Sequence, residues 1–169
     1  MAHTQIEAVV DACIAAGRHR PGSGFRRYSR RMWRAFNSLY PDFAPTWWQD
    51  LTVARSIGGI WFQFPLAGEQ PWLGDCVIPW PLKFWKLHKD HFYIHQLQES
   101  GLFPFGDASD GNWWLFDTGD SEDPLVHLLE LTAWDGTHFN TANGLHSPGV
   151  SLSEFFGAGA RWTSNGQMM

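Results

Sequence analysis

The chain has 169 residues and a formal net charge of −5, with 44% hydrophobic and 16% aromatic residues, which excludes an intrinsically disordered protein. No apolar run approaches the ~20 residues of a membrane span, and the first residues lack the charged and apolar regions of a signal peptide. We therefore expect one cytoplasmic domain over residues 1–169, without a membrane partner. The two cysteines, Cys13 and Cys76, are expected to be reduced and buried.

Charge is distributed unevenly along the chain. Residues 1–60 contain eight arginines, no lysine and four acidic residues, whereas residues 61–169 contain four basic and thirteen acidic residues. The two parts carry +4 and −9, which sum to −5. A dipolar chain of this kind can present an acidic face to a basic partner, although a solvated acidic loop accounts equally well for the count.

Three helices are predicted in the first 56 residues. Apolar residues recur at the helical period over 4–16, where Thr4 and Glu7 form a capping-box pair and Gly17 ends the helix. A second helix is predicted over 25–39 and a third over 46–56, the latter preceded by Pro45. The apolar stripe predicted for the second helix consists of Phe25, Tyr28, Met32, Phe36 and Leu39.

The arginines of residues 18–34 are interleaved with aromatic residues, a pattern that also occurs in proteins that contact nucleic acid. The net charge is negative, however, and the polar face of an amphipathic helix explains the pattern. We therefore expect no nucleic-acid partner.

Strands are predicted over 60–64 and 75–80, followed by a helix over 81–100. His88, His91 and His95 are spaced one turn apart on that helix, so three imidazoles would share part of one face, which suits zinc. The His-Glu-x-x-His order of metalloproteases is absent, and His91 falls in the apolar stripe. A small metal-dependent enzyme is therefore only an alternative, and no cofactor is expected.

A β-hairpin is predicted from strands at 102–106 and 112–117, because aspartates and Gly111 interrupt two apolar runs. A third strand is predicted over 124–131, then a short strand or irregular loop over 132–148. A final helix is predicted over 151–157, where Ser151 and Glu154 form a capping box. This order predicts an α+β fold: a mainly antiparallel sheet flanked by N-terminal helices and a short C-terminal helix.

Four motifs carry a resemblance to a known family: Phe103-Pro104-Phe105-Gly106-Asp107, Gly111 with Trp114-Leu115-Phe116-Asp117, Pro124-Leu125-Val126, and Val150-Ser151-Leu152-Ser153-Glu154-Phe155-Phe156. Over residues 102–157 the chain resembles the SUKH superfamily, the fold of the yeast cell-wall assembly regulator Smi1/Knr4 and of many bacterial toxin-immunity proteins. The resemblance implies a protein-binding domain without catalytic apparatus. In the family that the chain resembles, such a domain is most often an immunity protein that masks a cognate toxin, frequently a nuclease or another cationic enzyme. A scaffold or regulatory module without a toxin partner is the alternative.

An acidic surface with one aromatic anchor would suit such a partner. Only one of Trp113 and Trp114 can face outward on an alternating strand, unless both pack under loops. The residues expected at this surface are Asp107, Asp110, Trp113, Asp117, Asp120, Glu122 and Asp123.

No catalytic residue is expected. A Ser/His/Asp hydrolase has no Gly-x-Ser-x-Gly turn to support it, and Ser109 with His127 or His138 offers only loose candidates.

Overall fold

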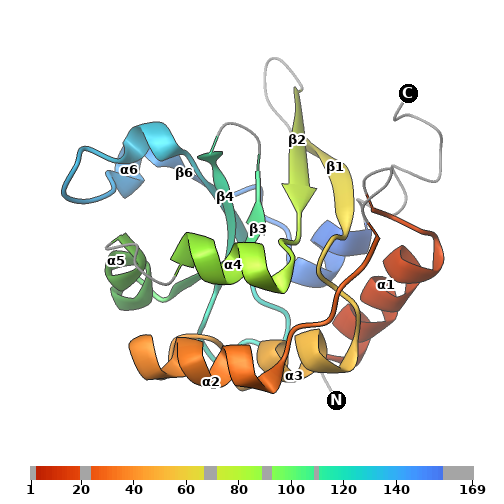
Figure 1. The fold of residues 1–169 in the computed structure, drawn as a ribbon. Helices are drawn as coiled ribbons and strands as arrows, with labels where there is room; N and C mark the ends of the chain where they lie inside the picture. The colour runs from red at the N-terminus through yellow and green to blue at the C-terminus, as the bar shows by residue number, and fades with distance from the viewer. Residues whose placement is uncertain (1–2, 20–23, 67–71, 89–92, 109–110, 158–169) are drawn as a thin grey trace.

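Six strands form one sheet in a computed structural model that describes residues 3–19, 24–66, 72–88, 93–108 and 111–157. The strand order is β1-β2-β3-β4-β5-β6, and each neighbouring pair is antiparallel, which confirms the predicted α+β fold (Figure 1). The strands are β1 Trp61–Leu66, β2 Trp72–Val77, β3 Leu102–Asp107, β4 Trp113–Asp117, β5 Val126–Leu129 and β6 Leu145–His146. A single pair, Val77 with Asp107, joins β2 to β3.

The helices precede, interrupt and follow these strands. They are α1 Thr4–Ala15, α2 Arg30–Leu39, α3 Thr46–Ala54, α4 Pro81–His88, α5 Tyr93–Glu99, the 3-10 helix η2 Leu131–Ala133, α6 Thr141–Gly144, and a last helix over 152–157. None of the helices within the described ranges combines the length and apolarity needed to cross a membrane.

The first helix ends as predicted but begins differently. The Gly17 N–H donates to the Ile14 carbonyl and the Arg18 N–H to the Cys13 carbonyl, a Schellman motif that Gly17 permits at a φ of 67°. At the N-terminus the cap residue is His3, and no side chain caps the helix. The predicted capping box of Thr4 and Glu7 is therefore wrong, and Glu7 Oε2 instead lies 3.6 Å from Arg55 Nη2.

The second helix begins at Arg30 rather than at Phe25. The Ser29 hydroxyl accepts from the Met32 N–H at 3.0 Å, which makes Ser29 the N-cap. Upstream, Arg26 forms an antiparallel bridge with Gly58, so this part of the chain is extended. The predicted stripe shifts accordingly: Trp33 and Phe36 are the buried residues of α2, whereas Leu39 is 46% exposed.

The predicted helix over 81–100 is divided into α4 and α5, and residues 89–92 lie outside the described ranges. The third helix is two residues shorter than predicted, because Arg55 is extended. The predicted loop region over 132–148 contains η2, α6 and β6.

The predicted hairpin is confirmed. β3 pairs with β4 from Leu102 opposite Asp117 to Asp107 opposite Trp113, and a bulge separates Pro104 from Gly106. At the turn Gly111 has a φ of 81°, a conformation that glycine adopts without strain. The capping box of the last helix is also confirmed, because the Ser151 N–H donates to Glu154 Oε2 at 2.9 Å.

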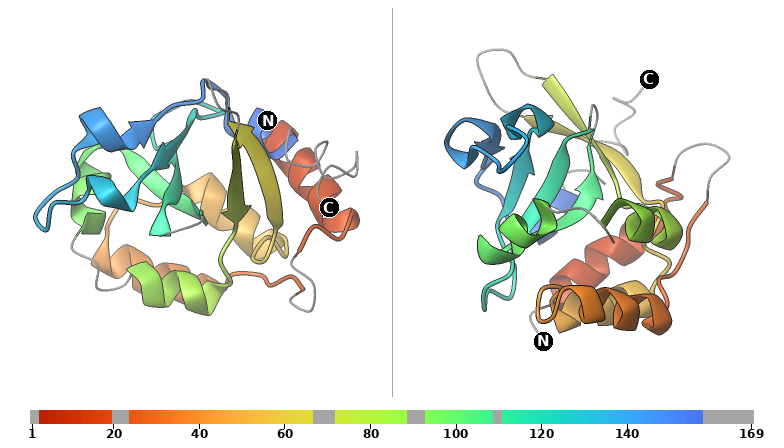
Figure 2. Two further views of the ribbon diagram at one scale, coloured as in Figure 1. Left: turned by 90° about the horizontal axis from the view of Figure 1, so that it is seen from above. Right: turned by 60° about the vertical axis from the view of Figure 1, so that its left-hand side comes forward.

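The helices α1, α2 and α3 gather on one face of the sheet (Figure 2). Aromatic side chains of α2, α3 and α4 contact rings of β3 and β4. The ring of Phe103 on β3 lies 5.3 Å from Phe43 and 6.2 Å from Phe84 on α4. The ring of Phe116 on β4 lies 5.4 Å from Trp48 on α3. Ring spacings of this size are typical of packed aromatic pairs, so a continuous aromatic core holds helices and sheet together.

Candidate binding surface

Asp107 stands at the end of β3 and forms an ion pair with α4. Its Oδ2 atom lies 2.8 Å from Lys83 Nζ. This pair connects α4 to the hairpin and neutralises the carboxylate, so Asp107 is less suited to attract a cationic partner than the sequence suggested. Asp110 and Ser109, in the turn that follows, lie outside the described residues.

The two tryptophans of β4 are both buried. Trp113 is 7% exposed, and the Trp114 ring packs 4.7 Å from Phe155 of the last helix. Neither tryptophan faces outward, because the residues on both faces of this central strand are buried. Of the two alternatives, the one in which both tryptophans are packed therefore holds. Trp113 offers little area as a contact anchor.

Asp117 ends β4 and contacts a histidine on the neighbouring strand. Its Oδ1 atom lies 3.0 Å from His127 Nε2, while His127 Nδ1 lies 2.6 Å from Ser147 Oγ. A neutral imidazole protonated at Nε2 donates to the carboxylate and accepts from the hydroxyl. The contacts of His127 with Asp117 and Ser147 thus connect β4, β5 and the segment after β6.

Asp117, His127 and Ser147 are the residue types of a serine-hydrolase triad, and the sequence alone did not indicate Ser147 as the third member. The ring nitrogens are exchanged, however: here the carboxylate contacts Nε2 and the hydroxyl contacts Nδ1, the reverse of the triad. Two further features argue against that chemistry. The Asp117 side chain is 41% exposed, whereas the orienting carboxylate of such triads is buried. Pro148 follows Ser147 and has no N–H to donate to an oxyanion. We assign the three residues a positioning role.

Asp123 caps the last helix from a distance of 30 residues in sequence. Its Oδ1 atom accepts from the Ser153 N–H at 2.9 Å, and its Oδ2 atom accepts from the Ser153 hydroxyl. Ser153 is buried, so the carboxylate satisfies polar groups that have left water. Its primary role is structural.

The remaining acids, Asp120 and Glu122, lie on the turn between β4 and β5, which we call the acidic turn (residues 118–123). Both are exposed, and neither has an ion pair or hydrogen bond within the described part of the chain. The turn itself is anchored at both ends, because the Thr118 N–H donates to the Gly101 carbonyl and Asp123 contacts Ser153. Two free carboxylates are thus held on an ordered turn.

The predicted acidic surface does not form one patch. Asp107 lies at the end of the hairpin where β4 begins, whereas Asp117 and the acidic turn lie where β4 ends. Five residues of strand separate the two groups by roughly 16 Å. The structure therefore places Asp120, Glu122 and the end of β4 together, and Asp107 apart from them.

The predicted cluster of His88, His91 and His95 falls partly outside the described residues. His88 ends α4, His95 belongs to α5, and His91 lies outside the described residues. The His95 ring contacts the Tyr40 ring at 5.3 Å. Among residues that the structure describes, no group of three or more histidine, cysteine or acidic side chains could hold a metal ion.

The arginine-rich segment of residues 18–34 does not present its arginines and aromatic residues as one interleaved surface in the part that the structure describes. Tyr28 and Trp33 are buried and cannot stack on bases. Arg26 lies over the Trp80 ring at 4.7 Å, and Arg30 Nη1 lies 3.1 Å from Asp50 Oδ1. Arg26 and Arg30 therefore serve contacts within the fold.

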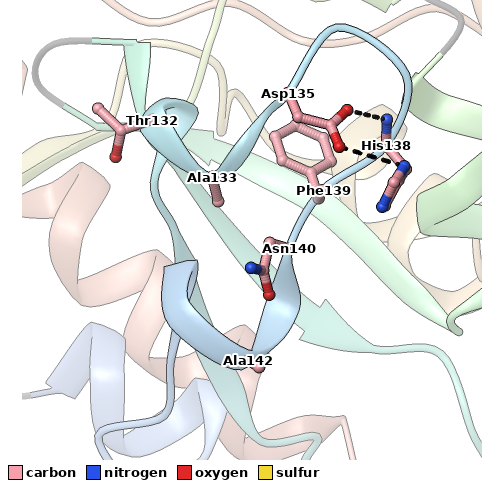
Figure 3. Close-up of a pocket in the computed structure, with 7 residues that line it drawn as sticks. All are labelled: Thr132, Ala133, Asp135, His138, Phe139, Asn140 and Ala142. Atoms are coloured by element: carbon pink, nitrogen blue, oxygen red, sulfur yellow. Dashed lines mark hydrogen bonds and ion pairs between the residues drawn. The ribbon is translucent and has the colours of Figure 1, made fainter.

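A hollow of about 680 Å³ lies in the loop between β5 and β6, next to α6 (Figure 3). Asp135 lines it, and its Oδ1 atom accepts from the backbone N–H groups of Thr137 and His138. These hydrogen bonds lower the pKa of Asp135 to about 2, and the bond from the His138 N–H has the largest effect. Because the carboxylate is already bonded to its own loop, it orders this loop, and we assign no ligand to the hollow.

Comparison with known proteins adds no relative: no family model matches the chain, and neither does any curated protein or solved structure.

Proposed function

We propose that this chain is a non-catalytic protein-binding domain that acts in the cytoplasm as an immunity protein and neutralises a cognate bacterial toxin by masking its surface. The resemblance to the SUKH superfamily over residues 102–157 supports the class of function. The observation that carries the proposal is the acidic turn, where Asp120 and Glu122 are exposed and have no ion pair within the described residues.

An ordered turn of this kind suits a cationic partner for two physical reasons. Free carboxylates steer a basic surface toward the turn, which accelerates association. Because Asp117 and Asp123 contact His127 and Ser153, the turn loses little conformational freedom on binding. Binding there would cover a basic cleft without any chemical step.

The test is to co-express the chain with the secreted product of each neighbouring gene and to measure growth rescue and co-purification. We expect Asp120→Lys and Glu122→Lys each to weaken binding by about 10-fold or more, with a larger effect at low salt. Asp50→Lys is the control, since it reverses an exposed carboxylate on α3; because Asp50 pairs with Arg30, urea unfolding checks that this variant remains folded. Growth rescue that is equally strong in all variants would rule out the acidic turn as the contact.

Co-purification with a neighbouring product that is harmless when expressed alone would instead support a scaffold or regulatory module. If no product binds, the protein-binding proposal fails.

A further inference from the structure

A second surface of opposite character lies between α2 and α4. A hollow of about 450 Å³ runs between the two helices, and we call it the α2–α4 groove. Its main lining residues are Arg31, Met32, Ala35, Pro81, Leu82 and Trp85. Most of these lining side chains are apolar, and none of the described lining residues is acidic.

The packing of α4 explains why these side chains face outward. Phe84 is buried and contacts α2, with its ring 5.4 Å from Trp33 and 5.4 Å from Phe36. Since residues two positions away on a helix do not share its face, Leu82 turns away from that core. Leu82 is 64% exposed, the largest value among the exposed large apolar side chains of the described residues.

Hydrogen bonds at one end of the groove fix the positions of its two walls. The Tyr28 hydroxyl donates to the Pro79 carbonyl at 2.6 Å, which joins the segment before α2 to the segment before α4. The Ser29 cap fixes the first turn of α2 at the same end. Both walls are thus positioned before any partner arrives, which lowers the entropic cost of binding.

Apolar surface continues along α2 beyond the hollow. Met32, Ala35 and Leu39 are spaced by three and then four residues, so they form one stripe on the helix. Leu39 is 46% exposed. The stripe from Met32 to Leu39 extends about 10 Å along α2, the same rise as two turns of a partner helix.

The rim of the groove is cationic. Arg31 lines it from α2, and Lys86 lies one turn after Leu82 on α4. Both are exposed, and neither has an ion pair with a described residue. Apolar anchors flanked by free cations are complementary to leucine-type side chains flanked by carboxylates.

We propose that the α2–α4 groove binds an acidic amphipathic helix of another protein, with apolar side chains against Leu82 and Met32 and carboxylates toward Arg31 and Lys86. Binding there does not depend on the acidic turn or on a toxin. A chain with both surfaces would recognise a basic region through the turn and an acidic helix through the groove.

The test uses a display library of helical peptides of about four turns, with leucine on one face and glutamate, lysine, alanine or glutamine randomised elsewhere. We expect selection on the full chain to enrich glutamate. Affinity of the best peptide, measured by fluorescence anisotropy, should fall by about 10-fold or more with Leu82→Asp and with the double change Arg31→Glu and Lys86→Glu.

Matched controls separate the groove from general surface effects. Leu125→Asp changes another exposed leucine, outside the groove, and Arg34→Glu changes an exposed cation of α2 that does not line the hollow. Both should retain peptide binding within about 2-fold. Unfolding in urea confirms that Leu82→Asp remains folded, which is expected because it adds no buried charge.

Three results overturn the proposal: selection without glutamate enrichment, including selection that yields no binder; peptide binding that is insensitive to Leu82→Asp; and groove-dependent association with something other than an acidic helix. Sedimentation of the chain alone detects binding of a second copy in the groove. Sedimentation with phosphatidylserine vesicles detects binding of an anionic membrane.

Discussion

Asp117 precedes the acidic turn and Asp123 is its last residue, and each is hydrogen-bonded to a different element, Asp117 to His127 and Asp123 to Ser153. Asp120 and Glu122, between them, remain exposed. At the level of single residues, the sequence does not separate these acids, because each is a carboxylate near a strand end. Their roles differ only in what the fold brings within hydrogen-bond distance.

Asp123→Ala is expected to destabilise the protein by about 2 kcal/mol, because it removes a charged acceptor from the buried Ser153 and from the start of the last helix. Urea unfolding measures the change. Glu122→Ala, one residue away and exposed, should stay within about 0.5 kcal/mol of the parent. Asp123→Ala with unaltered stability but weaker partner binding would contradict the structural role.

The thiol of Cys13 makes stability depend on alkaline pH. Burial raises the pKa of Cys13 from 9.0 to about 11, against the opposing effect of Arg18. The unfolded chain therefore releases this proton first, and the free energy of unfolding falls as pH rises from 9 toward 11. We expect the slope of urea stability against pH in this window to be shallower in Cys13→Ala. Equal slopes in the two proteins would exclude this thiol as the cause.

At the level of elements, α2 shows how a local pattern and a tertiary contact compete. Apolar spacing from Phe25 favours a helix there, but Arg26 pairs with Gly58 and the Tyr28 N–H donates to the Thr52 carbonyl. These long-range bonds keep the segment extended until Ser29 caps the helix. Periodicity could not reveal them, because the partners are more than 20 residues away.

Ser29→Ala is expected to lower the free energy of unfolding by about 1 kcal/mol, since the Met32 N–H loses its acceptor. Ser29→Asp keeps an acceptor and adds a negative charge at the helix N-terminus, so it should match or exceed the parent. Thermal or urea unfolding distinguishes the two. Similar losses for alanine and aspartate would show that the cap is not what Ser29 contributes.

At the level of the whole molecule, one aromatic cluster connects elements that are distant in sequence. Phe116 on β4 contacts Trp47 and Trp48 of α3 and Phe105 of β3, each at a ring distance of 5.4 Å. Because helices and sheet share these side chains, we expect them to unfold together rather than in separate steps.

Phe116→Leu should shift the unfolding midpoints from far-ultraviolet and near-ultraviolet circular dichroism together, with a loss of about 1–2 kcal/mol. The first signal reports backbone structure and the second reports aromatic packing. If the near-ultraviolet midpoint moves alone, the aromatic core and the secondary structure are not one cooperative unit.

The sequence by itself determined the α+β class, the β3–β4 hairpin and the capping box of Ser151 and Glu154. Each depends on residues close together in the chain, where turn chemistry and periodicity operate. The same reasoning included Asp120 and Glu122 among the acids expected at one surface, without separating them from the others.

Only the tertiary structure decided which acids stay free and where apolar surface stays exposed. Lys83 forms an ion pair with Asp107, and Ser153 donates hydrogen bonds to Asp123. The inward packing of Phe84 leaves Leu82 exposed in the α2–α4 groove. These outcomes depend on contacts between segments 24 or more residues apart or on the face by which one helix packs against another. Local sequence patterns do not predict such contacts, because the packing and hydrogen-bond energies that stabilise them arise only when the elements assemble.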